Sequence, residues 1–327
     1  MRIRRLGRTG VKVSPLCLGM MSYGSPQWRD WILDIDAGWP IVREAVELGF
    51  NFFDTANIYS LGESERVCGR LLKEFFSSRH EYVLATKVGL KMGDKPNQRG
   101  LSRKHILESI DASLQRLQVD YVDLFQIHRW DRETPIEETM EALAEVVRSG
   151  KALYIGASSM WTWQFARAQH WADSSSGVRF VSMQNHYNLI SREEEREMIP
   201  YCLDQGIGLI PWSPLARGFL AGNRTADRRG DTSRSTSDTI AHGYYYSAAD
   251  WEVLKQVEAI ASELGKSPVQ VSLAWLVQKP GVTSPIIGAT KPGQLTELAA
   301  ALEIELSEKQ ISRLEAPYCP KLPLELR

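Results

Sequence analysis

Hydrophobic residues along this chain alternate between short runs of β-forming residues and longer stretches with helical spacing. The run at Phe50, Phe52 and Phe53 follows a helix-like segment that ends in Gly49, and it stops abruptly at Asp54. Such a run of aromatic residues is typical of a buried strand. The sequence therefore predicts a strand that leaves the core at a carboxylate, with Tyr59 one short loop further on.

The same alternation predicts helices and strands along most of the chain. Segment 103–117 shows the helical period most clearly, because apolar residues recur there every three or four positions. Helix starts are indicated by Pro40, Thr134-Pro135, Ser191-x-x-Glu194 and Ser267-Pro268. We expect strands at 16–19, 50–53, 82–87, 122–128, 152–156, 180–184, 208–212 and 285–288, with helices near 40–48, 63–77, 103–117, 134–148, 161–172, 191–204 and 267–278.

Strands that alternate with helices and carry few polar residues are typical of a parallel sheet buried on both faces. Eight such units predict an α/β fold, a (β/α)8 TIM barrel with an N-terminal β-hairpin at 6–10 and extra helices, as one domain over 1–327. A doubly wound sheet is the alternative, but G-x-G-x-x-G does not follow the first strand at 18–23. The polar segment 222–247 breaks the alternation, which indicates a lid, a binding loop or disorder.

Composition narrows the class of protein. The 327 residues include 39 basic and 40 acidic side chains, and this balance of charge favours neither nucleic acid nor an anionic membrane as partner. We expect no membrane span and no secretory signal, because long apolar runs are absent and no apolar segment follows the basic N-terminus. Four scattered cysteines predict reduced thiols in a cytoplasmic protein, without a metal site; the oligomeric state stays open.

Polar residues follow the strands at the end where a barrel gathers its chemistry. They are Asp54 and Tyr59, Lys87, His128, Ser158 and Ser159, Gln184 and Asn185, and Trp212 and Ser213. Singly, each has a structural explanation, such as a helix cap for Asp54 or core packing for Trp212. Together they form a set in which a cation can depress the pKa of a phenol, a carboxylate can hold that cation, and an imidazole can orient a carbonyl group.

Six motifs in order carry a resemblance to a known family. They are Phe53-Asp54-Thr55-Ala56-x-x-Tyr59, Ala85-Thr86-Lys87, Asp123-Leu124-x-Gln126-Ile127-His128, Gly156-x-Ser158-Ser159, Gln184-Asn185-x-Tyr187-Asn188 and Trp212-Ser213-Pro214-Leu215. With them the chain resembles the aldo-keto reductase superfamily over nearly its whole length, and in particular its bacterial and potassium-channel-β-like branch. The resemblance implies that Tyr59 is a general acid, that Lys87 stabilises the tyrosinate, that Asp54 pairs with Lys87, and that His128 donates to the substrate carbonyl.

The resemblance also implies a nicotinamide cofactor in an extended pose across the barrel mouth, without a Rossmann domain. Ser158, Gln184 and Asn185 would bind the carboxamide, Trp212 would stack on the nicotinamide, and Ser213, Leu215 and Gly218 would approach the pyrophosphate. Gly288, Thr290, Gln294 and Glu297 would surround the adenosine, where free N–H groups at a helix start favour phosphate oxygens. Gly19, Met20 and Pro214 complete the implied cofactor site.

The sequence departs from the family at the adenosine end. Leu298 stands where an asparagine often contacts adenine, and Gln294 replaces an arginine that grips the 2′-phosphate in many relatives. We therefore expect NADPH as cofactor, with NADH possible. Lys291, Arg217, Arg224, Arg228 and Arg229 are candidate sources of positive charge, and we expect at least two of them to be solvated.

Tyr23, Trp28, Arg129 and Trp130 are the expected substrate-binding residues, because the loops after the first and fourth strands would flank the catalytic residues. Core packing beneath the loops is the alternative for Trp28.

The function that the resemblance implies is reduction of aldehydes or ketones with NADPH. The alternative is an NADPH-binding regulatory subunit with little turnover, and the short stretch before the Leu6-Gly7 turn favours the enzyme. A barrel enzyme that acts on sugar phosphates without redox chemistry is a third and weaker alternative.

Overall fold

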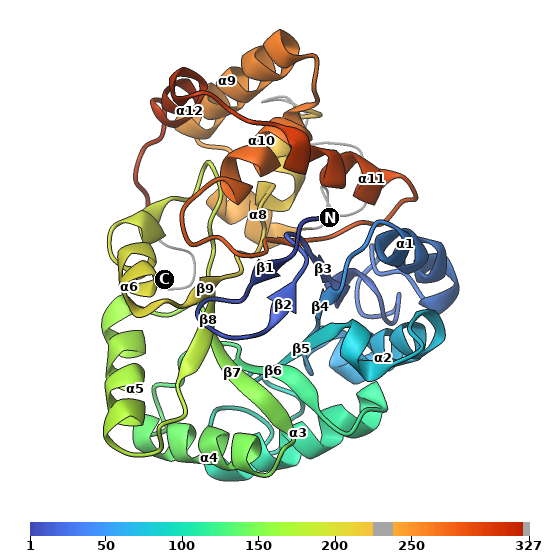
Figure 1. Ribbon diagram of the computed structural model, residues 1–327, viewed down its shortest axis with the longest axis vertical. Coiled ribbons are helices and arrows are strands. Elements are labelled where there is room, and N and C mark those ends of the chain that lie inside the picture. Colours follow the sequence, from blue (N-terminus) through green and yellow to red (C-terminus); the bar gives the residue numbers. More distant parts are fainter. Residues whose placement is uncertain (225–237, 323–327) are drawn as a thin grey trace.

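The computed structural model of the chain describes residues 1–224 and 238–322. Within these ranges, eight parallel strands form one sheet in the order β10-β3-β4-β5-β6-β7-β8-β9. Bridges between Trp212 and Ile286 and between Leu209 and Val282 join its two edges, so that the sheet closes into a barrel (Figure 1). The strands are β3 (Cys17–Gly19), β4 (Phe52–Asp54), β5 (Val83–Val88), β6 (Val122–Ile127), β7 (Ala152–Ser158), β8 (Phe180–Gln184), β9 (Gly208–Leu209) and β10 (Ile286–Ile287). The predicted (β/α)8 barrel is confirmed.

Helices surround the barrel, and most of them lie where the hydrophobic pattern predicts them (Figure 1). They are α1 (Ile35–Glu47), α2 (Glu63–Phe75), α3 (Arg103–Leu117), α4 (Ile136–Arg148), α5 (Thr162–Ser174), α6 (Met198–Gln205) and α10 (Pro268–Val277). Extra helices are α8 (Thr239–Tyr244), α9 (Ala248–Leu264), α11 (Gln294–Ala299) and α12 (Glu308–Glu315). Part of the predicted 222–247 loop is thus α8, while Arg228 and Arg229 lie outside the described residues.

Three predicted helix starts are wrong, and a side-chain hydrogen bond accounts for each difference. Helix α1 begins at Ile35, since the side chain of Asp34 accepts a hydrogen bond from Ala37 N, and Pro40 lies inside the helix. Helix α6 begins at Met198 instead of near Ser191, whose hydroxyl is hydrogen-bonded to His186 and Tyr244. Helix α4 begins after Pro135, because the hydroxyl of Thr134 donates to Asp131.

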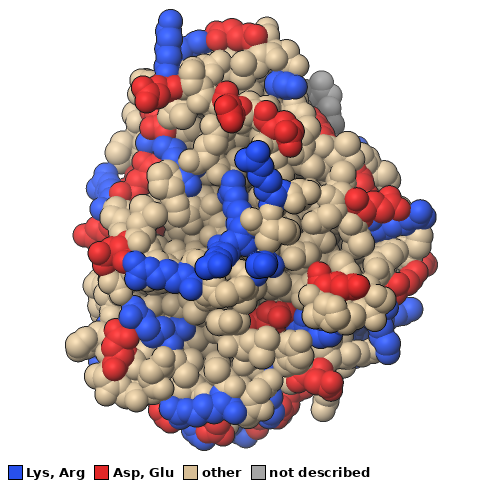
Figure 2. Space-filling view, viewed as in Figure 1, with Lys and Arg blue, Asp and Glu red and all other residues tan. Residues whose placement is uncertain are grey.

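The predicted N-terminal hairpin, β1 (Arg4–Arg5) with β2 (Lys12–Val13), is confirmed, and it closes one end of the barrel. Leu6 and Val13 are buried in one cluster with Cys17 and Phe52, at the starts of their strands. Figure 2 shows Lys and Arg side chains gathered over the middle of this face. Arg4 donates to the carbonyl oxygens of Val282 and Val277, so it ties the hairpin to the end of α10 and the segment that follows.

Strand register brings the polar residues to the opposite end. Because side chains alternate along a strand, Lys87 points to the same side as Val83 and Ala85, which lie in the barrel interior. Lys87 is paired with Gln126 across β5 and β6, and Asp54 is paired with Ala85 across β4 and β5. The barrel interior is therefore apolar near the hairpin and polar at the carboxyl ends of its strands.

The hairpin should contribute to stability through its buried side chains. We expect Leu6→Ala to lower the free energy of unfolding by about 2–5 kcal/mol, because it leaves a cavity in a packed interior. Ile3→Ala, at a half-exposed neighbouring position, should change it by less than about 0.5 kcal/mol. Denaturant titrations of both variants measure the difference. Equal stabilities would contradict the packing of the hairpin against the barrel interior.

Candidate active site

Lys87 is the centre of the polar end of the barrel. Its Nζ lies 2.5 Å from Asp54 Oδ2, 2.8 Å from the carbonyl oxygen of Thr55 and 3.3 Å from the hydroxyl of Tyr59. The side chain is fully buried, so its charge depends on these partners. The structure therefore brings Asp54, Tyr59 and Lys87 together as the sequence predicts.

Electrostatics keep the Lys87 ammonium charged. Burial alone would lower the pKa of Lys87, but the charge of Asp54 and the hydrogen bonds to Asp54 and Tyr59 outweigh burial and raise it above its ordinary value. Lys87 is therefore a fixed cation, 3.3 Å from the Tyr59 hydroxyl, throughout the physiological pH range.

His128 stands beside Tyr59 and is the fourth predicted residue of the cluster. The two rings meet edge to face, with centroids 5.7 Å apart. Burial, together with the positive charges of Lys87 and Arg129, holds the pKa of His128 well below its usual range. Among the described residues, the buried Nδ1 of His128 has no hydrogen-bond partner. The ring is thus a neutral imidazole at neutral pH, with hydrogen-bonding capacity left for a ligand.

Two buried amides occupy the second oxygen of Asp54. Gln126 Nε2 donates to Asp54 Oδ1 over 2.9 Å, and Gln184 Nε2 donates to the same oxygen over 3.0 Å. Gln184 Nε2 also donates to Gln126 Oε1, at 3.1 Å. With Lys87 on Oδ2, both oxygens of Asp54 are engaged, which suits a residue that orients its neighbour and transfers no proton.

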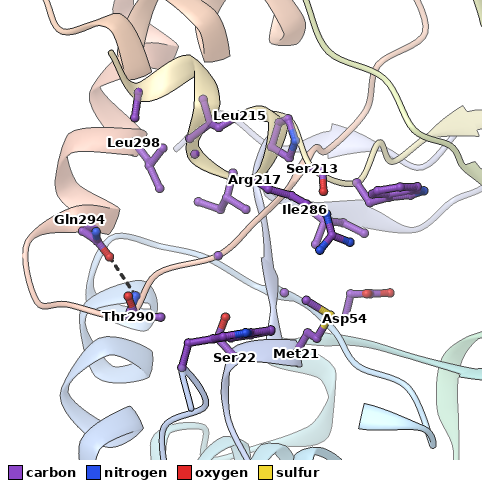
Figure 3. Close-up of a pocket in the computed structure, with 18 of the residues that line it drawn as sticks. Met21, Ser22, Asp54, Ser213, Leu215, Arg217, Ile286, Thr290, Gln294 and Leu298 are labelled. Atoms are coloured by element: carbon purple, nitrogen blue, oxygen red, sulfur yellow. Dashed lines mark hydrogen bonds between the residues drawn. The ribbon is translucent and has the colours of Figure 1, made fainter. Parts of the chain in front are cut away.

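An elongated cavity of about 720 Å³ opens over these residues. In Figure 3, Thr290, Gln294 and Leu298 lie at one end of the cavity and Asp54 and Met21 at the other. Most of the predicted site residues line it: Gly19, Asp54, Tyr59, His128, Arg129, Ser158, Gln184, Trp212, Ser213, Pro214, Leu215, Gly218, Gly288, Thr290, Gln294 and Glu297. Residues at the carboxyl ends of seven of the eight strands, or in the segments that follow them, therefore meet along one cavity.

Several predicted residues lie elsewhere. Tyr23 is fully buried and its hydroxyl donates to the carbonyl oxygen of Ala289, so its side chain does not face the cavity. Met20 is also buried in the core, and Trp28 packs against Arg29. Trp130 borders a separate cavity of about 460 Å³ together with Trp161 and Trp163.

Other side chains of the loop after β3 line the cavity in place of Tyr23 and Trp28. They are Met21, Ser22, Trp31 and Leu33. Trp28 and Trp31 are both aromatic residues of this loop. No periodicity of the sequence distinguishes them. Backbone hydrogen bonds between Leu33 and both Ser22 and Gly24 fold the loop back and decide which residue faces inward.

Trp212 and Asn185 lie at the carboxyl ends of neighbouring strands. The Trp212 ring is stacked on His186 with centroids 4.1 Å apart, and its Nε1 donates to Ser159 Oγ at 3.0 Å. The side-chain amide of Asn185 is buried, and among the described residues neither its nitrogen nor its oxygen has a hydrogen-bond partner. A buried amide with both groups unpaired is costly, and a ligand with its own amide would satisfy it.

The distant end of the cavity differs from the prediction. The N–H groups of Gly293 and Thr296, at the start of α11, donate to the Glu44 carboxylate at 2.9 Å, so they are not free for a phosphate. Gln294 Oε1 accepts from the backbone N–H groups of Thr290 and Lys291. Positive charge reaches this cavity from side chains, and Arg217, Arg224 and Lys291 all line it.

Strained backbone is concentrated around the cavity. Most non-glycine residues with positive φ in the described part of the chain follow Tyr59, follow β7 or lie in the loop after β9: Ser60, Leu61, Ser159, Ser213, Ala216 and Arg217. Such conformations cost about 1–3 kcal/mol each and are retained chiefly where a site requires them.

In the ranges 1–224 and 238–322, no group of three or more His, Cys, Asp or Glu side chains is placed to hold a metal ion. No helix in these ranges is long and apolar enough to cross a bilayer.

The low pKa of His128 should make stability sensitive to acid. The unfolded residue titrates near pH ~6.5, so the neutral folded form contributes stability above this pH, and the contribution is lost as pH falls from ~6.5 towards the folded pKa. We expect the melting temperature of His128→Asn to fall less between pH 7.5 and pH 5 than that of the wild type. His80→Asn, on the exposed surface, should follow the wild type, and a parallel loss in all three proteins would contradict a buried neutral His128.

Comparison with known proteins agrees with this geometry. The model of the aldo/keto reductase family matches residues 15–318. A versiconal hemiacetal acetate reductase from Aspergillus parasiticus is 44% identical, with 98% of both chains covered. The aldo-keto reductase dtxS3 from Metarhizium robertsii is 43% identical over 97% of this chain and 90% of its own. A Schizosaccharomyces pombe protein, provisionally named an aryl-alcohol dehydrogenase, is 42% identical over 96% of this chain and 95% of its own. The chain belongs to the aldo/keto reductase family.

Proposed function

We propose that this protein reduces aldehydes and ketones to alcohols with NADPH, and that Tyr59 is its general acid. The observation that carries the proposal is the placement of the Tyr59 hydroxyl: it borders the cavity, lies 3.3 Å from the Lys87 ammonium and stands beside His128. A carbonyl oxygen at this point would meet a proton donor and a neutral hydrogen-bond donor together. Such an arrangement suits protonation of the oxygen during reduction.

The residues along the cavity fit a nicotinamide cofactor. The cavity extends from Asp54 to Gln294, which suits an extended dinucleotide. Asn185 directly follows the cavity-lining Gln184, and its buried amide, which has no partner among the described residues, has a donor and an acceptor that suit a carboxamide. Gln184 uses its N–H groups on Asp54 and Gln126, which leaves its Oε1 to accept from a ligand. Trp212 presents a flat ring that His186 supports from behind. The bound cofactor would supply the hydride.

In this proposal the four polar residues divide the work. Tyr59 gives its proton to the carbonyl oxygen, and the charged Lys87 stabilises the phenolate that remains. Asp54 holds Lys87 in place, with both oxygens occupied by donors. Neutral His128 donates a hydrogen bond to the same carbonyl oxygen and helps to orient it.

The substrate class follows from the walls near Tyr59. Trp31, Leu33, Met21 and Arg129 line the same cavity as Tyr59. Flat and apolar walls favour aromatic aldehydes and ketones. The name of one relative, an aryl-alcohol dehydrogenase, also points to aryl compounds. We further propose that the reaction takes place in the cytoplasm and that the chain forms one domain.

Replacement of the general acid tests the proposal directly. Tyr59→Phe removes the proton donor and should lower kcat/KM for 4-nitrobenzaldehyde by about 10²-fold or more, while NADPH binding persists. Tyr201→Phe, on α6, is the matched control and should keep the wild-type rate. NADPH consumption measures the rates and quenching of NADPH fluorescence measures binding. Equal rates for Tyr59→Phe and wild type would rule out the assignment of Tyr59.

Preference for NADPH over NADH should depend on side-chain cations near Thr290. Lys291 is exposed and lines the cavity, so Lys291→Met should weaken NADPH binding about fivefold, the size of one solvent-exposed charge contact. NADH binding should change by less than about twofold, because NADH lacks the 2′-phosphate. Lys266→Met, exposed on the loop before α10, is the control. Equal weakening of both cofactors would show that Lys291 does not recognise the phosphate.

A further inference from the structure

The buried amides of Gln126 and Gln184 both contact Asp54, which pairs with Lys87 beside the proposed acid. Both donate to Asp54 Oδ1, at 2.9 and 3.0 Å, and they are joined to each other by a 3.1 Å hydrogen bond. All three side chains are buried. Without these donors, Asp54 Oδ1 would be an unsatisfied carboxylate oxygen inside the barrel, which is costly in a medium of low dielectric.

Strand register fixes where the Gln126 amide lies. Gln126 is paired with Lys87 across β5 and β6, so its side chain enters the same interior layer. On the other side, Gly156 of β7 leaves the room that the amide needs, because a Cβ at Gly156 would come within 3.1 Å of Gln126 Cγ. Gln126 therefore reaches Asp54 from a fixed direction, with little freedom to turn elsewhere.

We propose that Gln126 is a positioning residue, which holds the Asp54 carboxylate so that its Oδ2 keeps Lys87 against Tyr59, and which fixes Gln184 with its Oε1 towards the cavity. This inference rests on the proposed reductase function. Gln126 touches neither the Tyr59 hydroxyl nor the cavity surface, so it acts only through its two neighbours. It thereby links the acid to the residue that would receive the cofactor amide.

Two substitutions at Gln126 should differ in their pH dependence. Gln126→Leu removes the donor at every pH. Gln126→Glu keeps the shape: when protonated it can donate an O–H to Asp54 Oδ1, and when ionised it places a second negative charge against Asp54. The charged and titratable groups that face this position are Asp54 and Lys87, with Tyr59 and His128 beside Lys87 and with Cys17 nearer the hairpin.

The experiment compares kcat for NADPH-dependent reduction of 4-nitrobenzaldehyde from pH 5.5 to 8.5. We expect Gln126→Leu to lose about tenfold or more at all pH values, a loss typical of a misplaced catalytic group. Gln126→Glu should lie within about threefold of wild type at pH 5.5 and fall at least about tenfold below it by pH 8.5. Gln169→Leu and Gln169→Glu remove another buried amide, which binds the backbone of Phe180, and should keep the wild-type pH profile.

A ratio of Gln126→Glu to wild-type kcat that does not change with pH would overturn the proposal, as would a wild-type rate for Gln126→Leu. If Tyr59→Phe is inactive in the same assay, the reductase function stands and only the role of Gln126 fails. If the wild type reduces no carbonyl compound, the proposed function fails. Thermal unfolding without cofactor then tests separately whether Gln126 holds Asp54.

Thermal unfolding has its own expected sign. Burial beside Asp54 raises the folded pKa of a glutamate, so Gln126→Glu should be most stable at low pH and lose melting temperature relative to wild type as pH rises from 5.5 to 8.5. In an Asp54→Asn background, this loss should shrink by at least about half, because the repelling charge is gone. An unchanged loss in that background would overturn the assignment of Gln126 to Asp54.

Discussion

The buried ion pair between Lys87 and Asp54 is the constraint on which this site depends. An ammonium group with no exposed surface is tolerated only where a carboxylate and further acceptors compensate for its lost hydration. Strand β4 and the segment after it supply those compensating groups, since Thr55 and Tyr59 also contact Lys87 Nζ. Removal of one partner would leave a charge in the barrel interior, so the register of β4, β5 and β6 is tied to the chemistry at their ends.

The same cation sets the state of the neighbouring imidazole. Lys87 keeps its proton because Asp54 is 2.5 Å away, and its charge then adds to burial in holding the pKa of His128 low. One group is therefore fixed as charged and its neighbour as neutral, by a single arrangement of side chains. In the proposed reaction, this difference separates the residue that stabilises a phenolate from the residue that donates a hydrogen bond.

The barrel and the cluster of Asp54, Lys87 and His128 could be predicted from the sequence, because the positions of the strands and their ends follow from periodicity. Helix α3 agrees with its predicted bounds since its apolar stripe is regular, and Asp54, Lys87 and His128 are found at strand ends as expected. Loops have no such period. Trp28 and Trp31 have the same signal, and backbone bonds at Leu33 select Trp31 for the cavity. Contacts between distant segments, such as Glu44 with α11, leave no local sequence pattern at all.

Glu44 changes the chemistry expected at the far end of the cavity. Its carboxylate accepts hydrogen bonds from Gly293 and Thr296, and these bonds outweigh burial and lower the pKa of Glu44, so it is ionised at neutral pH. A negative charge at the start of α11 occupies the groups that would otherwise attract a phosphate, and it repels one. A 2′-phosphate in the proposed complex would have to be met by flexible cations such as Lys291. Selection of NADPH would therefore rest on side-chain charge and become weaker as ionic strength rises.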